Sequence, residues 1–269
     1  MAHQARKRFG QHFLTDPSII NAIIARIHPE IQDRIIEIGP GLGAMTLPLL
    51  EQGISLEVVE IDRDLIEFWQ KKNIAQLTIY QADALDYDFS NWAKIALDEI
   101  KHSQSKGRVK IVGNLPYNIS TPLLFHLIDA IDHVEEQIFM LQKEVIDRMV
   151  AKPGDSEYGR LSVMLQIRYH LELCFEVPPT AFEPPPKVNS AIVAMYPKKN
   201  IELSPLQWKA LEKIVAKAFS QRRKVLANNL SEYKEILGLD QQVLRSRAQD
   251  IDGPTYLSWA NQLVLANQL

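Results

Sequence analysis

The chain has 269 residues, of which 46% are hydrophobic and 23% charged, with a formal net charge of -3. This composition is typical of an ordinary globular protein with room for one large domain and a smaller one. It contains no run of about 18 apolar residues and its start lacks the apolar segment of a signal peptide, so we expect neither a membrane partner nor export. Cys174 is the only cysteine, which excludes an internal disulfide, favours a place in the core and fits a reducing cytoplasm.

Apolar periodicity predicts helices and strands in alternation from the N-terminus onward. The first helix starts at Asp16 and Pro17, as N-cap and first helical residue, and turns an isoleucine face inward. Further strands are expected at residues 35–38, 56–61, 77–81, 109–112 and 137–141, and helices at 45–50, 63–72 and 122–130, the last capped by Thr121. Such alternation is typical of an α/β fold, with a largely parallel sheet and helices on both faces.

The later part of the chain changes character twice. Two β-rich runs at residues 171–177 and 191–196 are expected to add an antiparallel pair at one sheet edge, and the Pro-rich stretch 182–188 between them to form a rigid loop. After about residue 200 only helices are expected, one starting at Ser204 and Pro205 and one covering 256–265, so we place a domain boundary there.

Charge divides along the chain in the same way. Residues 1–184 hold 18 Lys and Arg against 26 Asp and Glu, whereas residues 185–269 hold 12 against 7. A basic end of this kind indicates either a polyanionic partner or only a solvated helical surface, and charge density does not decide between them.

The tetrapeptide Asn114-Leu115-Pro116-Tyr117 follows the fourth predicted strand. The exocyclic amine of a nucleobase is a poor nucleophile, and the Asn114 carbonyl with a backbone carbonyl near Pro116 could hold both of its protons while the nitrogen turns tetrahedral. Tyr117 would stack on an extruded base. The pattern is similar to the adenine-N6 methyltransferase motif, although alone it also fits an ordinary turn.

A second constellation precedes it. Glycines at 39, 41 and 43 end the first strand, Glu60 ends the second and Asp83 follows the third. Glycines let a ligand approach the backbone closely, and a carboxylate at the next strand can accept hydrogen bonds from ribose hydroxyls. The spacing also fits a dinucleotide site, so binding of NAD stays open from these residues alone. A nicotinamide enzyme has no evident use for the tetrapeptide at the same sheet edge, which favours a methyltransferase.

With these motifs the sequence resembles the ribosomal RNA adenine N6-dimethyltransferase family, most closely its bacterial members that act on 16S rRNA. The resemblance covers nearly the whole chain. The matching residues are 10–14, 37–43, 60–62, 83–85, 114–117, 142–145, 182–190 and 219–224.

The resemblance implies a Rossmann-like class I methyltransferase sheet in an S-adenosylmethionine-dependent domain at residues 1–200, and a smaller all-helical RNA- or ribosome-binding domain at 201–269. The residues themselves show no cluster of His, Cys or carboxylates at metal-ligand spacing, so we expect no metal. The S-adenosyl-L-methionine site would be lined by His12 (Asn in many members), Leu14, Gly39, Gly41, Glu60, Asp83 and Asn114. Catalysis would use Asn114, Pro116 and Tyr117, with Phe182 facing Tyr117 across the base. RNA phosphates would be held by Arg6, Lys7, Arg8, Lys187, Arg222, Arg223 and Lys224, of which the last three occupy consecutive helical positions.

The implied activity is N6,N6-dimethylation of two adjacent adenosines in a 3'-terminal hairpin loop of 16S rRNA. It would act on an immature small ribosomal subunit during ribosome biogenesis, as a cytoplasmic monomer. Three alternatives stay open: a large-subunit rRNA adenine dimethyltransferase of the macrolide-resistance type, a DNA adenine methyltransferase, and a mainly non-catalytic small-subunit assembly factor.

Overall fold

The structure is a computed structural model, and residues 12–267 are described below. The chain divides into two compact units. Unit 1 comprises the described residues up to Ile146 together with Glu172–Pro197, and unit 2 comprises Asp147–Leu171 together with the described residues from Lys198. A single cut at residue 200 does not describe this division, because residues 147–171 group with the C-terminal helices.

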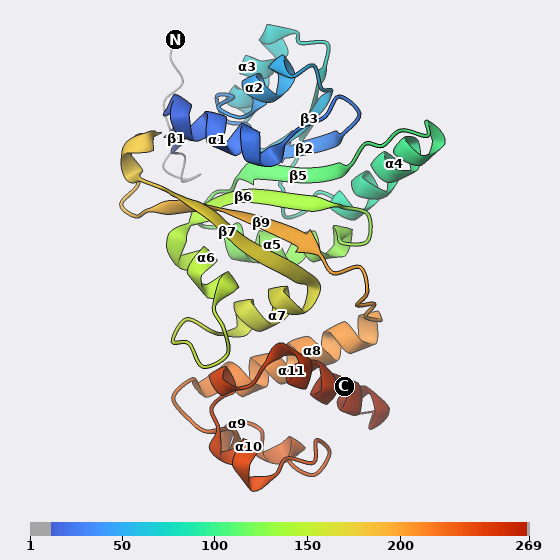
Figure 1. Cartoon of the computed structure of the whole chain (residues 1–269), viewed down its shortest axis with the longest axis vertical. Coiled ribbons are helices and arrows are strands. Elements are labelled where there is room, and N and C mark those ends of the chain that lie inside the picture. The colour runs from blue at the N-terminus through green and yellow to red at the C-terminus, as the bar shows by residue number, and fades with distance from the viewer. Residues whose placement is uncertain (1–11, 268–269) are drawn as a thin grey trace. The chain divides into compact units, whose positions relative to one another are not determined.

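The central sheet has seven strands in the order β4-β3-β2-β5-β6-β9-β7 (Figure 1). Strands β2 to β6 pair in parallel, and β9 runs antiparallel to β6. The predicted parallel sheet with an antiparallel edge is therefore confirmed. The bounds are β2 (Arg34–Ile38), β3 (Leu56–Glu60), β4 (Leu77–Gln81), β5 (Val109–Asn114), β6 (Glu136–Gln142), β7 (Tyr169–Val177) and β9 (Ser190–Pro197).

Helices alternate with these strands. Asp16 caps the first of them, accepting from the Ser18 amide at 2.8 Å, as the sequence predicts. Thr121 as the cap of the later helix is wrong: that helix begins at Ser120, so Thr121 lies inside it, and its start has no side-chain cap. The helix at 89–102 was not predicted. The bounds are α1 (Pro17–Ile27), α2 (Thr46–Glu51), α3 (Arg63–Lys72), α4 (Phe89–His102), α5 (Ser120–His126), continued by a 3₁₀ turn to Ala130, and α6 (Lys143–Val150).

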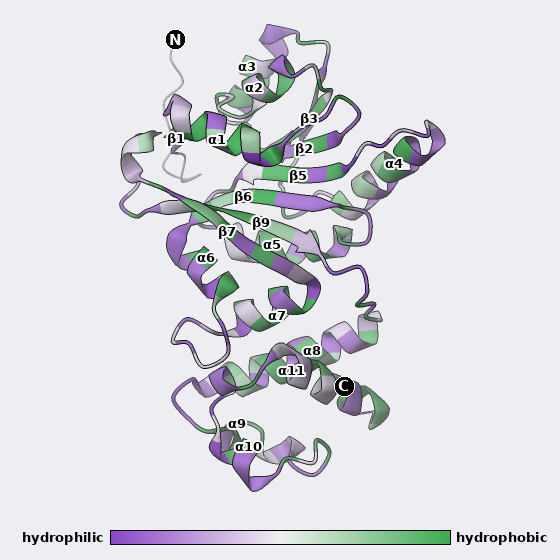
Figure 2. Ribbon diagram, viewed as in Figure 1, coloured by the Kyte–Doolittle hydropathy of each residue, from purple (hydrophilic) through white to green (hydrophobic). Residues whose placement is uncertain are grey.

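Both faces of the sheet are buried. On one face Ile35 and Val112 belong to a single apolar cluster with Ile23 and Ile27 of α1. On the other face lie further buried residues, namely Ile36, Ile38, Val59, Ile111, Phe139, Leu141, Val193 and Met195. Figure 2 shows hydrophobic colour over much of β2 and β5, interrupted by hydrophilic stretches, as expected for strands that are largely covered on both sides. Cys174 packs partly buried against the first cluster, and burial raises the pKa of its thiol.

Unit 2 is built from helices. Ser204 and Gln207 form a capping box at the start of α8, whose predicted inner face of Leu211, Ile214 and Val215 is fully buried. Helix α8 packs against α7 and α11. The bounds are α7 (Arg160–Arg168), α8 (Pro205–Ala218), α9 (Leu226–Asn229), α10 (Gln241–Arg245) and α11 (Gly253–Leu265). Across residues 12–267, no helix combines the length and apolar character needed to span a membrane.

Candidate active site

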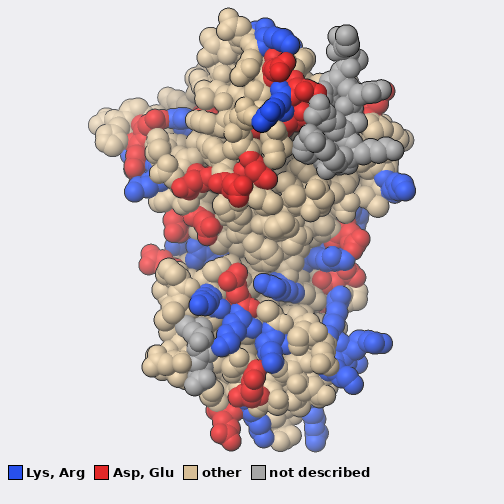
Figure 3. All heavy atoms as spheres, turned by 180° about the vertical axis from the view of Figure 1, so that it is seen from behind, with Lys and Arg blue, Asp and Glu red and all other residues tan. Residues whose placement is uncertain are grey.

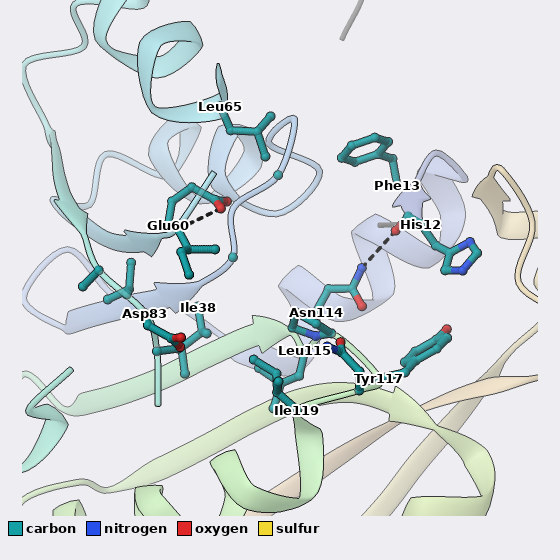
Figure 4. A pocket seen from close by; sticks show the side chains of 18 residues that line it. His12, Phe13, Ile38, Glu60, Leu65, Asp83, Asn114, Leu115, Tyr117 and Ile119 are labelled. Atoms are coloured by element: carbon teal, nitrogen blue, oxygen red, sulfur yellow. Dashed lines mark hydrogen bonds between the residues drawn. The ribbon is translucent and has the colours of Figure 1, made fainter. Parts of the chain in front are cut away.

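The carboxyl ends of four parallel strands meet at a cavity of about 340 Å³ (Figure 4). One sequence-predicted residue lines it from each strand end: Gly39 after β2, Glu60 on β3, Asp83 after β4 and Asn114 on β5. Ligands bind at this edge of open α/β sheets because strand order reverses there and leaves a crevice.

The glycine loop after β2 has a backbone that only glycine adopts easily. Gly39, Gly41 and Gly43 have φ values of 69°, 54° and 100°. The Trp69 indole donates to the Gly41 carbonyl at 3.0 Å, and a Cβ on Gly43 would lie 2.6 Å from the Trp69 ring. The loop is thus fixed by α3, while Gly39 and Gly41 face the cavity without side chains.

Glu60 presents a carboxylate that backbone amides hold in place. Its Oε1 accepts from the amides of Ile61 and Asp62, at 2.9 and 2.8 Å. Burial raises the pKa of Glu60, and hydrogen bonds from the Asp62, Ile61 and Gly41 amides oppose that effect. The carboxylate also lines the cavity, where it can accept a hydrogen bond from a ligand.

Glu37 lies beside this site on β2 and is 1% exposed. The Thr46 hydroxyl donates to its Oε2 at 2.7 Å. Burial raises the pKa of Glu37 to about 7, the Thr46 hydrogen bond opposes the rise, and the charge of Glu60 adds to it. Two carboxyl groups therefore lie close together at the ends of neighbouring strands, in surroundings that disfavour their ionised forms.

Asp83 and a set of apolar residues complete the lining of the cavity. Asp83 Oδ1 accepts from the Leu85 amide at 2.9 Å, which fixes its carboxylate at the strand end. The sequence did not single out the apolar lining, although most of these residues flank the motifs: Phe13, Ile38, Val59, Ile61, Leu65, Ala84, Leu115 and Ile119. Apolar walls with a few polar groups are typical of a cofactor site.

The tetrapeptide has a fixed backbone. The Leu115 amide donates to the Met140 carbonyl at 3.1 Å, and the Pro116 carbonyl accepts from the Ile119 amide at 3.2 Å. The Asn114 amide nitrogen donates to the His12 carbonyl at 3.4 Å, which orients the side chain (Figure 4). Within residues 12–267, neither Asn114 Oδ1 nor the Leu115 carbonyl accepts a hydrogen bond, so both remain available as acceptors.

Tyr117 is half-buried and held at two places. Its hydroxyl lies 2.7 Å from Ser190 Oγ, and burial raises its pKa. Its ring stacks with His12, with ring centroids 5.8 Å apart and an interplanar angle of 25° (Figure 4). The His12 ring is itself held, because its Nδ1 lies in hydrogen-bond contact with the Pro184 carbonyl at 2.8 Å.

Two predicted site residues lie in the core instead of on the 340 Å³ cavity. Leu14 is 6% exposed and Phe182 is 4% exposed. They pair directly across a two-stranded sheet of β1 (Phe13–Leu14) and β8 (Phe182–Glu183), so the predicted loop 182–188 begins with a short strand. Leu14 lines a neighbouring cavity of about 430 Å³. The expected sandwich of Phe182 and Tyr117 is not present in this structure, where the ring beside Tyr117 is that of His12, and a stacking role for Phe182 stays a prediction.

The predicted phosphate-binding residues are exposed where they are described. Lys187 is exposed in unit 1, and Arg222, Arg223 and Lys224 are exposed in unit 2. Their expected consecutive helical positions are wrong, because α8 ends at Ala218 and a 3₁₀ turn precedes them. The Arg222 guanidinium donates to the Ser156 carbonyl. The lower part of Figure 3, which contains the C-terminal helices, shows Lys and Arg side chains gathered on one face. Arg6, Lys7 and Arg8 lie outside the described residues.

The site is built from amides, carboxylates and carbonyls. Within residues 12–267, no three His, Cys, Asp or Glu side chains come together in a group that could hold a metal ion.

The family model described as ribosomal RNA adenine dimethylase matches residues 2–254. The chain belongs to this family. It is therefore an S-adenosylmethionine-dependent rRNA adenine methyltransferase, as the sequence motifs predicted, and binding of NAD is set aside.

Relatives agree with this assignment, and solved structures show the same fold. The ribosomal RNA small subunit methyltransferase A of Ralstonia nicotianae is 49% identical over 97% of this chain and 91% of its own length. That of a Janthinobacterium species is 51% identical over 98% of this chain and 100% of its own length. A dimethyladenosine transferase of Plasmodium falciparum has a TM-score of 0.75 at 24% identity, over 95% of this chain and 98% of that one. The 23S rRNA methyltransferase ErmE has a TM-score of 0.63 at 20% identity, over 94% and 99%. The last two show a shared fold.

Proposed function

We propose that this protein dimethylates N6 of two adjacent adenosines in the 3'-terminal hairpin loop of 16S rRNA, within an immature small ribosomal subunit. The observation that carries the adenine chemistry is that Asn114 ends β5 at the same cavity as Glu60 and Asp83. The relatives named for the small subunit, 49% and 51% identical to this chain, support the small-subunit substrate over a large-subunit one.

The donor set of the cavity fits S-adenosylmethionine. The Glu60 carboxylate would accept from the ribose hydroxyls, and Asp83 would accept from the adenine amine, while the bare backbone at Gly39 and Gly41 leaves room beside the carboxyl end of β2. When bound, the cofactor supplies an activated methyl group as an electrophile. The protein has no need to generate a strong nucleophile, so positioning and relief of developing charge are its main tasks.

Asn114 and Leu115 would hold the amine that receives the methyl group. Two protons leave the plane of the base as its nitrogen becomes tetrahedral, and Asn114 Oδ1 and the Leu115 carbonyl are two neutral acceptors for them. The Pro116 carbonyl is less suited, because it already accepts from the Ile119 amide. Tyr117 would stack on the base and stabilise its positive charge as that charge develops. Water would then take the released proton.

The basic residues outside the cavity would select the RNA. One adenosine fits any adenine methyltransferase pocket, so choice of a single hairpin requires phosphate contacts elsewhere. Lys187, Arg223 and Lys224 are exposed and available for this, with Arg6, Lys7 and Arg8 as further candidates.

We place the activity in the bacterial cytoplasm and assign it to a monomer. A mainly non-catalytic assembly factor is disfavoured, because the acceptors at Asn114 and Leu115 are intact.

Mass mapping of methylated nucleotides in rRNA tests the proposal. In a strain that lacks the gene, we expect two adjacent dimethyladenosines to be lost from the 3'-terminal hairpin of 16S rRNA, and restored by the wild-type gene. Loss at a site in 23S rRNA would instead support the large-subunit alternative. Unchanged modification in both rRNAs, with accumulation of immature subunits, would favour the assembly role.

A further inference from the structure

We propose that Ser190 is the positioning residue for the Tyr117 ring in the methyltransferase site. Ser190 lies at the start of β9, far from the tetrapeptide in sequence, and does not line the 340 Å³ cavity. Its hydroxyl is nevertheless 2.7 Å from the Tyr117 hydroxyl. This inference rests on the proposed function, because it concerns how the aromatic group that receives the target base is aimed.

Hydrogen bonds fix the backbone of Tyr117, but they do not fix the orientation of its ring. The Ser120 hydroxyl donates to the Tyr117 carbonyl at 3.2 Å, and the Ile119 amide closes the turn onto the Pro116 carbonyl. These contacts leave the two side-chain torsions of Tyr117 free to change. The stacked His12 ring limits the motion only weakly, because an offset ring pair is worth about 0.5 to 1.5 kcal/mol beyond its burial. A hydrogen bond at the hydroxyl, the atom farthest from Cα, restricts both torsions at once.

Ser190 is well suited to serve as an anchor. Its side chain is 0% exposed. Its backbone pairs with Gln142 in the register of β9 and β6, and the preceding Asn189 carbonyl accepts from the Lys143 amide at 2.9 Å. A buried hydroxyl on a strand that pairs with β6 has little freedom to move. The hydrogen bond to Ser190 therefore ties the Tyr117 hydroxyl to the rigid sheet.

This tie has a consequence for the reaction. Stacking on a base stabilises developing positive charge only when the ring plane lies parallel to the base plane and close to it. A ring that samples several orientations would bind the base less often in the reactive geometry. Loss of the Ser190 hydroxyl should therefore lower the efficiency of methyl transfer and leave the nucleoside end of the cavity, at Glu60 and Asp83, unaffected.

A double-mutant cycle tests the inference on the full-length protein with immature small subunits as substrate. Ser190→Ala and Tyr117→Phe each remove one side of the same hydrogen bond. We expect each to lower kcat/KM about three- to tenfold, the worth of one neutral hydrogen bond, and the double variant to be no worse than either single variant. Affinity for S-adenosylmethionine, measured by calorimetry, should stay at the wild-type value in all three.

A spectroscopic readout separates positioning from loss of stability. In a hairpin RNA with 2-aminopurine at the target adenosine, stacking on Tyr117 should quench the fluorescence, and Ser190→Ala should reduce that quenching. Ser162→Ala is the matched control: Ser162 is also 0% exposed and donates to a backbone carbonyl, that of Arg148, but it lies in unit 2. It should lower the melting temperature without changing the fluorescence signal.

Two results would overturn the inference while leaving the proposed function intact. One is additive losses from Ser190→Ala and Tyr117→Phe, and the other is wild-type quenching in Ser190→Ala by an enzyme that methylates normally. Failure of the proposed function looks different, because the wild-type protein itself would then not methylate small-subunit rRNA.

Discussion

Glu37 offers a test of the site's electrostatics that does not depend on activity. Glu37 lies on β2 with its carboxyl group inside the protein. Burial raises the pKa of that carboxyl group from an ordinary 4.5 to about 7. A group with a raised carboxyl pKa binds its proton more tightly in the folded chain than in the unfolded chain. Between the two pKa values the folded state therefore holds more protons, and the free energy of unfolding falls as pH rises.

The size of this effect follows from the two pKa values. A shift of one pKa unit corresponds to about 1.4 kcal/mol, and the loss of stability from Glu37 alone between about pH 5 and pH 8 then amounts to about 2.5 kcal/mol. Below about pH 3.5 the group is almost fully protonated in both states and contributes little slope. Above about pH 8 it is almost fully ionised in both states, and the slope again disappears.

Glu37→Gln should remove this part of the pH profile. The amide oxygen of Gln can still accept from the Thr46 hydroxyl. Its buried NH₂ group would lack a hydrogen-bond acceptor, which should lower the free energy of unfolding by about 1 to 3 kcal/mol at acid pH. We expect urea unfolding to show a wild-type stability that falls relative to the variant as pH rises from about 5 to about 8. The control is Glu67→Gln, whose side chain is 65% exposed and which should follow the wild-type profile. Parallel profiles for wild type and Glu37→Gln would refute a buried, proton-binding Glu37.

Three further predictions concern the cavity and its support. Glu60→Ala should weaken S-adenosylmethionine binding by about 1.5 to 3 kcal/mol in calorimetry, as expected for lost charge-assisted hydrogen bonds, and an unchanged Kd would exclude it from the site. Asn114→Ala should lower the single-turnover rate by about 10²- to 10³-fold with little change in RNA affinity, and a wild-type rate would remove it from the mechanism. Gly43→Ala should lower the melting temperature and weaken cofactor binding, because its φ is 100° and its Cβ would lie 2.6 Å from the Trp69 ring; an unperturbed variant would mean that the loop adapts.

The parts of the fold that the sequence predicts well are those with a local signal. Strands β2 and β5 are short apolar runs, and each ends in a motif that forces a turn. The helix at Phe89–His102 also had such a signal, since Asp88 accepts from the Asn91 amide as its N-cap and Trp92, Ala96 and Ile100 repeat at helical spacing. The apolar periodicity of residues 89–102 is therefore sufficient to predict this helix.

Other features depend on contacts that no local pattern contains. Phe182 lies in the core because β8 pairs with β1, at residues far away in the sequence. The membership of residues 147–171 in unit 2 follows from the packing of α7 against α8 and α11. Likewise the contact of Ser190 with Tyr117 joins the first residue of β9 to the turn after β5, 73 residues earlier, and neither residue type predicts the other.

The distribution of polar groups around the cavity fits the charges that methyl transfer requires. Three carboxyl groups, those of Glu37 on β2, Glu60 at the end of β3 and Asp83 after β4, lie on the side where the cofactor's cationic end and its hydroxyl and amine donors would be held. The end of β5 offers only neutral acceptors, at Asn114 and Leu115. A nucleobase amine is neutral before the reaction and gains its charge during it, so acceptors that hold its protons favour the charged state without first trapping a cation. Because the methylated amine is a strong acid until it loses its proton, water suffices as the final acceptor, and a carboxylate base at the β5 end is not needed.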